Sequence, residues 1–264
     1  MKATIPAVVA PLRPDRGLDR HYSPSVALQW LKAGWRDLLQ QPGLSLIYGF
    51  GVFLVSAAIV VGLFAFEWDY ILFPAFAGFM VVGPILAIGL YEKSRRLATN
   101  TPVTLTDMIF VHAGSAGQVM FTGLLLCCVA LLWMRAAVIV YALFFGLLPF
   151  PGLDHVVPML FTTVPGLALL IVGSIIGALF AAFSFAVSAF SIPMLLEEQV
   201  DALTAMGTSM QLVWHNLPVM LTWGLIVSLL FLLSLVTGLL GLIVIFPLLG
   251  HGTWHAYRAI RPQR

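Results

Sequence analysis

His251 and His255, close to the C-terminal end, are the pair of residues whose type and spacing best suit metal binding. They lie in the segment PLLGHGTWHAYR, which runs from Pro247 to Arg258. Residues four apart in a helix project from one face, so the two imidazoles could chelate a zinc ion, or one could ligate haem iron. The pair lacks the glutamate of an H-E-x-x-H protease motif. A plainer interpretation is that the aromatic residues and Arg258 anchor a helix end at the membrane interface, with both histidines bonded to loops or headgroups.

Further ligands would have to come from polar residues that we expect on the same side of the membrane. A haem held between two helices could take His251 and His215 as axial ligands. This candidate cytoplasmic rim consists of Glu92, His112, Glu197, Glu198, His215 and Arg258.

A second group of titratable residues, Arg135, Asp154 and His155, borders a long apolar segment. Residues 136–148 are 13 apolar residues, too few to cross a bilayer. We expect a helix that continues past its span and bends along the outer leaflet, with the Arg135 side chain reaching the headgroups. This outer flap would either dock on a partner, enclose a lipid-like ligand, or serve only as an anchor.

The chain contains no recognisable catalytic motif. There is no G-x-S-x-G sequence, no P-loop, and no Asp, Glu, Lys, Arg or His in the middle of any apolar run. Pumps and proton-coupled transporters place such groups in the membrane. We therefore expect no enzymatic activity and no proton-coupled transport.

The composition indicates a membrane protein. Of 264 residues, 61% are hydrophobic and 9% are charged, whereas a soluble domain has about 25% charged residues. Lipid must therefore solvate most of the surface. The net charge of +2 comes without a basic stripe, which excludes a nucleic-acid partner.

The apolar runs predict an all-α polytopic bundle. A span needs about 20 apolar residues, and the chain offers six: residues 44–66, 70–91, 118–138, 166–196, 218–236 and 239–257. Residues 1–22 form a flexible cytoplasmic tail, and residues 23–264 form the membrane domain.

The basic residues predict the orientation. Of 13 Lys and Arg, six precede the first span, three follow the second and three lie at the C-terminal end, which leaves only Arg135 on the opposite side. Basic residues concentrate on the cytoplasmic side, so both termini should be cytoplasmic, with an even number of spans.

Short amphipathic segments precede three of the spans. The first, residues 23–41, begins with Ser23 as the N-cap and carries Lys32, Arg36 and Asp37 opposite an apolar stripe. Such helices lie in the headgroup plane.

An interfacial helix followed by a helical hairpin would then occur three times. Each returning span carries a proline (Pro84, Pro193 and Pro247). This suggests a three-fold repeat, although prolines also kink unrelated helices near membrane exits.

The segments WLKAGWRDLLQQPGLSLIYG, VGPILAIGLYEKSRR and PLLGHGTWHAYR resemble the DUF2189 family of predicted integral membrane proteins. The resemblance covers most of residues 23–260. It implies a polytopic inner-membrane protein and transfers no reaction and no site residues.

We expect a non-catalytic accessory or assembly component that packs against other membrane proteins through the flap and the rim. One alternative is a carrier for an apolar or amphipathic solute or lipid. Another is a haem or metal handling protein that uses His251 and His255.

Overall fold

The computed structural model describes residues 18, 21–146 and 151–261, and their regular structure is entirely helical. The predicted all-α class is confirmed. The elements are α1 (Val26–Leu39), α2 (Pro42–Ala65), the 3-10 turn η1 (Asp69–Ile71), α3 (Leu72–Leu86), α4 (Ile88–Ala98), α5 (Leu105–Ile109), α6 (Ala116–Phe145), α7 (Leu153–Thr162), α8 (Val164–Ser188), α9 (Ser191–Glu197), α10 (Ala202–His215), α11 (Leu217–Val236) and α12 (Leu242–Ile260). Most of the predicted tail, residues 1–17 and 19–20, lies outside the described residues.

Five helical stretches are long and apolar enough to cross a membrane, and each lies where a span was predicted. They are Pro42–Ala65, Asp69–Ala98, Ala116–Phe145, Val164–Glu197 and Leu217–Val236. Their most apolar 18-residue windows are only 6 to 28% buried, so most of these side chains face outward. An apolar surface of this extent requires lipid around it. The protein is therefore a multi-pass membrane protein.

The sixth predicted span, residues 239–257, takes a different form. Its helix, α12, does not belong to the stretches that qualify by length and hydropathy within the described chain. Its C-terminal half is polar and aromatic, and much of it is buried, including His251, Trp254 and Tyr257. This half packs against α1 and α4, so its surroundings are protein rather than lipid. Six crossings are not established by these criteria.

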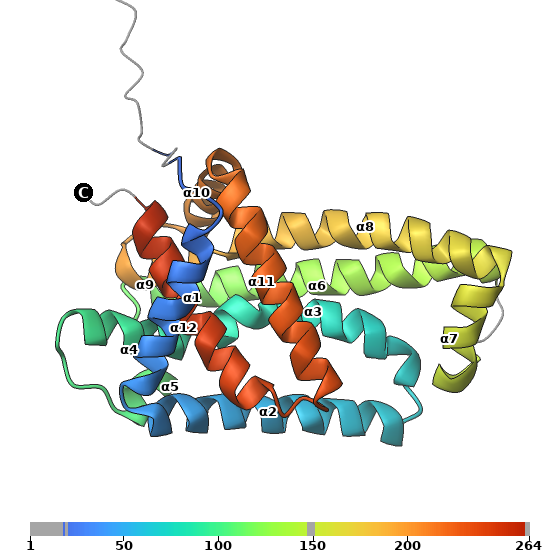
Figure 1. Cartoon of the computed structure of the whole chain (residues 1–264), viewed down its shortest axis with the longest axis horizontal. Coiled ribbons are helices and arrows are strands. Elements are labelled where there is room, and N and C mark those ends of the chain that lie inside the picture. The colour runs from blue at the N-terminus through green and yellow to red at the C-terminus, as the bar shows by residue number, and fades with distance from the viewer. Residues whose placement is uncertain (1–17, 19–20, 147–150, 262–264) are drawn as a thin grey trace, which may run out of the picture.

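The helices divide the molecule into two ends (Figure 1). α2, α6 and α8 run in a shared direction, and the α11–α12 hairpin crosses them obliquely. α1, α4, α5, α9 and α10 gather at one end, together with the C-terminal end of α12, whereas α7 lies at the other end. The polar residues of these gathered helices are thereby brought together.

The three predicted repeat units differ in the structure. The interfacial helices have 14, 5 and 14 residues (α1, α5 and α10). The second returning span breaks near Phe190, just before the helix that holds Pro193, whereas α12 continues through Pro247 without a break. A three-fold repeat is therefore not established.

The predicted bend after Arg135 is wrong. α6 runs as one 30-residue helix from Ala116 to Phe145, because no proline or glycine interrupts it between Gly123 and Gly146. Gly146 ends it with a positive φ of 62°. The apolar residues after Arg135 thus lengthen the span instead of forming a separate surface helix.

The predicted polar face of α1 is also partly wrong. Lys32 and Arg36 are exposed, but Asp37 is buried, and the N-cap is Ser25 rather than Ser23. A Cβ added at Gly34 would lie 2.6 Å from the backbone nitrogen of Gly252, so α1 and α12 are in backbone contact. Close packing on α12 carries Asp37 into the core.

Candidate functional site

Six polar side chains from four helices form a buried cluster at the end where α1, α4 and α12 meet. Lys93 and His251 have no exposed surface, and Asp37 is 8% exposed. We call this set the polar cluster; its members are Asp37 on α1, Ser45 on α2, Lys93 and Ser94 on α4, and His251 and His255 on α12.

The ammonium group of Lys93 is fully hydrogen-bonded. Its Nζ donates to Ser45 Oγ at 2.8 Å and to the backbone oxygens of Asp37 and Gln41 at 3.1 Å each. Three donors thus meet three acceptors. Because the Asp37 carbonyl belongs to the last turn of α1, the cation also satisfies a helix C-terminus, where positive charge is favoured.

His251 lies between two serines that fix its tautomer. Its Nε2 is 2.9 Å from Ser45 Oγ and its Nδ1 is 2.8 Å from Ser94 Oγ. Ser94 donates its proton to Asp37 Oδ2 at 2.6 Å, so it must accept from a protonated Nδ1. Nε2 then accepts from Ser45, which itself accepts from Lys93. Hydrogen bonds therefore run in one direction from the Lys93 ammonium to the Asp37 carboxylate.

The Asp37 carboxylate ends this chain and is held by a second donor. His255 Nε2 lies 2.9 Å from Asp37 Oδ2. Burial by itself raises the pKa of Asp37, but the hydrogen bonds from His255 and Ser94 outweigh it and hold that pKa below its usual value. Asp37 is therefore ionised and balances the charge of Lys93.

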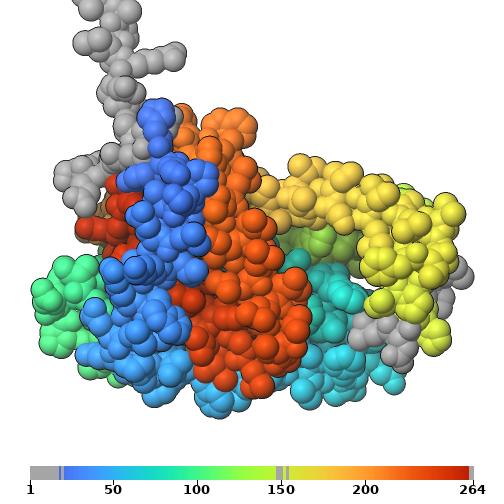
Figure 2. Space-filling view, in the orientation of Figure 1, coloured from blue at the N-terminus to red at the C-terminus, as the bar shows by residue number. Residues whose placement is uncertain are grey.

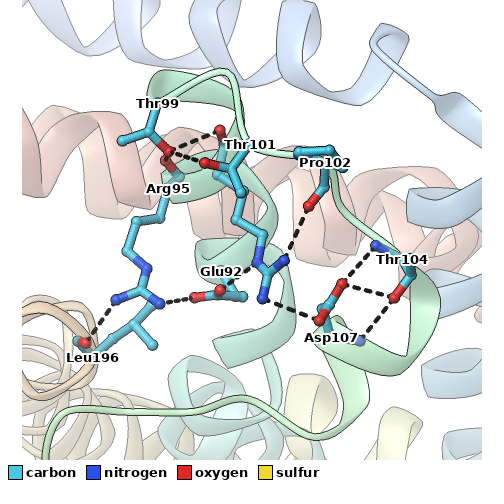
Figure 3. Close-up of polar contacts among 9 residues, drawn as sticks. Glu92, Arg95, Thr99, Thr101, Pro102, Thr104, Asp107 and Leu196 are labelled. Atoms are coloured by element: carbon cyan, nitrogen blue, oxygen red, sulfur yellow. Dashed lines mark hydrogen bonds and ion pairs between the residues drawn. The ribbon is translucent and has the colours of Figure 1, made fainter.

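Glu92 belongs to a separate group of ion pairs, shown in Figure 3. Its side chain is buried, with Oε2 2.7 Å from Arg95 and Oε1 2.7 Å from Arg96. Arg96 also pairs with Asp107 at 3.0 Å, and Asp107 forms a capping box with Thr104, the N-cap of α5. These contacts join α4 to α5 and place both carboxylate oxygens of Glu92 in ion pairs.

The other predicted rim residues have partners of their own. Glu197 pairs with Arg258, and Glu198 pairs with Arg261 at 2.7 Å. His215 Nδ1 is 2.8 Å from the Gln211 carbonyl, and His112 is exposed. The structure therefore does not gather the rim around His251.

The described side chains do not fit a metal centre. No group of three or more His, Cys, Asp or Glu among them could hold a metal ion. His251 and His255 share one cluster, but both ring nitrogens of His251 are occupied by serines. Neither a zinc ion nor a haem iron could bind His251 without breaking the cluster.

The predicted flap residues stand apart from the polar cluster. Arg135 is exposed within α6, and His155 is exposed on α7. The side chain of Asp154 lies outside the described part of the chain.

A cavity of about 860 Å³ lies between α2 and α3, with α5, α6, α11 and the start of α12 contributing to its wall. Its lining is apolar apart from Tyr48 and Ser56, and the Tyr48 hydroxyl already donates to the Leu86 carbonyl at 2.8 Å. Lining residues such as Val55 and Ile59 are also exposed at the molecular surface. This lateral cavity therefore opens toward the surrounding lipid.

Sequence reasoning missed most of the polar cluster. Lys93 was counted only as a basic residue beside a span, and Asp37 only as a polar-face residue. The two are 56 residues apart, and no local spacing connects them. The i, i+4 pair His251 and His255 was the one signal that pointed to this place.

Comparison with protein families gives a match over residues 72–197 to a family described as predicted integral membrane protein (DUF2189). The matched region begins at α3, ends in α9 and includes Lys93 and Ser94. No curated protein and no solved structure matches the chain.

Proposed function

We propose a function inside the bilayer, because residues 72–197 match the family described as predicted integral membrane protein (DUF2189). The protein binds an apolar or amphipathic, lipid-like molecule in the lateral cavity and acts as its carrier, without catalysing a reaction. The lateral cavity is the observation on which this proposal depends.

The size and chemistry of the cavity support a ligand of this class. Sites for small molecules commonly measure about 300–1,000 Å³ and are mostly apolar, and the lateral cavity has about 860 Å³. With Ser56 as its remaining polar side chain, the wall suits a hydrocarbon chain better than a polar solute.

Access from the lipid is supported by the packing of α2. The only buried residues of this 24-residue helix are Ser45 and Gly49, both in its first third. The rest of α2 packs loosely on the other helices and has exposed residues such as Val61 and Phe64. A ligand could therefore enter sideways between α2 and α3.

The proposal includes six crossings with both termini in the cytoplasm of a bacterium, in the inner membrane. Its support is the return of the α11–α12 hairpin. Asn216, just before α11, donates to the Leu18 carbonyl at 2.7 Å, and the Tyr22 hydroxyl donates to the Ala259 carbonyl near the end of α12 at 3.2 Å. Leu18 and Tyr22 thus contact the start of α11 and the end of α12, which must lie on the same side of the membrane. Either both helices cross the membrane or neither does.

The test is gentle solubilisation followed by native mass spectrometry of the purified protein. We expect one lipid-like molecule per chain to travel with the wild-type protein. A Phe at Gly51 should displace it, because Gly51 lines the cavity and a Cβ there has no atom within 4 Å.

The matched control is Gly62→Phe. Gly62 lies on the same helix with equally open space but outside the cavity wall, so this variant should retain the ligand. Absence of any bound molecule from wild type, or its retention by Gly51→Phe, would refute the proposal.

The accessory role predicted from the sequence remains the second candidate. Its support is the exposed end formed by α7 (yellow in Figure 2), which projects away from α1 and α12. Phe161 on α7 and Val164 at the start of α8 are 65% and 82% exposed. In the same experiment, this role predicts a stoichiometric partner protein that is lost when residues 151–162 are deleted.

A further inference from the structure

A second, smaller cavity of about 170 Å³ lies inside the bundle, between α3, α8, α11 and α12. Phe79, Phe231 and Leu242 line both cavities. The rings of Phe79 and Phe231 stack with centroids 5.4 Å apart and an interplanar angle of 9°. This ring pair therefore forms a partition between the lateral cavity and the inner one.

The inner cavity contains a hydroxyl group that the described residues leave unpaired. Ser184 on α8 is 3% exposed and lines the cavity, and its Oγ has no hydrogen-bond partner among the described residues. Tyr91 lines the same cavity at 1% exposure. Buried polar atoms are nearly always hydrogen-bonded, so the Ser184 hydroxyl points to a partner that the described residues do not supply.

The rest of the wall is apolar and aromatic. Trp133, Phe180 and Trp223 contribute to it. An engineered apolar cavity of about 150 Å³ binds benzene, so a cavity of about 170 Å³ accommodates a molecule of about that size.

We propose that the inner cavity is a binding site for a small, mainly apolar molecule with one hydrogen-bonding group, of the size and chemistry of phenol. The ring lies among the aromatic side chains, and its polar group bonds the hydroxyl of Ser184. This site is separate from the lateral cavity and does not depend on the function proposed for it.

The experiment compares phenol with benzene as probes of the full chain, labelled with 5-fluorotryptophan and studied by fluorine NMR in detergent micelles. Trp223 and Trp133 line the cavity, whereas Trp35 and Trp68 are exposed and report partition into the micelle. We expect phenol to shift the Trp223 signal saturably while the signals of Trp35 and Trp68 move little.

Two variants make the test specific. Ser184→Ala should weaken phenol binding about two- to tenfold, the effect of losing one hydrogen bond, and leave benzene binding unchanged. Gly83→Leu should prevent binding of both probes, because Gly83 lines the cavity with no atom within 4 Å of an added Cβ.

Ser56→Ala, in the lateral cavity, is the control and should bind phenol like wild type. Unchanged phenol affinity in Ser184→Ala would overturn the proposal, as would a Trp223 signal that moves no more than that of Trp35. If the Trp223 signal moves no more than that of Trp35, water would be the remaining partner for the buried Ser184 hydroxyl. Either failure leaves the Gly51→Phe result on the lateral cavity unaffected.

Discussion

The fold accommodates the buried ammonium group of Lys93 because each of its three N–H donors has a hydrogen-bond acceptor. Lys93 neutralises Asp37 through Ser45, His251 and Ser94, and each hydroxyl both accepts and donates one hydrogen bond. Networks of this kind are stable when complete and costly when one member is lost. The cluster joins α1, α2, α4 and α12, so its main effect is to fix how these helices meet.

This arrangement predicts a strong coupling between Lys93 and Asp37. Lys93→Met and Asp37→Asn should each lower the free energy of unfolding by about 3–5 kcal/mol, because each removes the charge that balances the other buried group. The double variant should lose much less than the sum of the two. Chemical unfolding in detergent, followed by circular dichroism, measures this, with Lys32→Met on the exposed face of α1 as a control. Additive losses would contradict the coupling.

The pH dependence of the same experiment has a defined sign. The pKa of folded Asp37 lies below the ordinary value of 3.8, so its bonds stabilise the fold above pH 3.8 and are lost as the pH falls through the lowered pKa. The stability difference between wild type and Asp37→Asn should therefore shrink in acid.

At the scale of elements, the sequence predicted best the helices that lipid surrounds. The predicted spans 44–66 and 218–236 differ from α2 and α11 by at most two residues at each end, because continuous hydrophobicity defines the spans and a proline marks the start of each helix. Whether α12 is a span was harder to predict, because an apolar run followed by aromatic residues gives the same sequence pattern whether lipid or protein surrounds the helix. The third predicted span, 118–138, ended before α6 does, because Arg135 was placed at the outer headgroups and the apolar residues after it were expected to bend along the outer leaflet.

Close helix contacts were also hidden from the sequence. Gly173 and Gly177 form a GxxxG pair, a pattern typical of helix packing, but only Gly177 is close to another helix: a Cβ there would lie 3.1 Å from the Trp133 ring of α6, whereas one at Gly173 would meet its nearest atom at 3.8 Å. The tightest approaches involve glycines outside that motif, including Gly34 and Gly49, whose partners lie on α12. Such contacts depend on the partner helix, about which local spacing says nothing.

Gly49 and Gly51 form a matched pair that tests this contact. A Cβ on Gly49 would collide with the Ile243 carbonyl oxygen of α12, whereas one on Gly51 meets nothing within 4 Å. Gly49→Ala should therefore cost about 1–3 kcal/mol by overpacking, and Gly51→Ala should be neutral or up to about 1 kcal/mol stabilising through helix propensity. Thermal unfolding in detergent separates the two. Equal midpoints would show that α2 does not depend on its contact with α12.

For the whole molecule, charge and packing favour the same arrangement. The basic residues near the first, second and last spans lie on α1, α4 and α12, including Arg36, Arg95 and Arg258, and these helices pack together at one end. The sequence could anticipate this asymmetry from counting alone. It could not anticipate the two cavities, because each is bounded by helices that are distant in sequence.

The orientation proposed from this asymmetry can be tested with fusions in a bacterial host. Green fluorescent protein does not fluoresce when it is exported unfolded to the periplasm, so it should fluoresce when fused behind Arg264. Alkaline phosphatase is active only in the periplasm and should be inactive at the same position. Phosphatase inserted after Trp68, between α2 and η1, should be active. The physical reason is that twelve of the 13 basic residues would otherwise face the periplasm, against the charge bias of membrane insertion. Phosphatase activity behind Arg264 would refute this orientation. If the fusion after Trp68 were then inactive, the whole protein would be inverted; if it were active, α11 would cross without α12 returning, which is incompatible with the contacts of Leu18 and Tyr22 to the two ends of that hairpin.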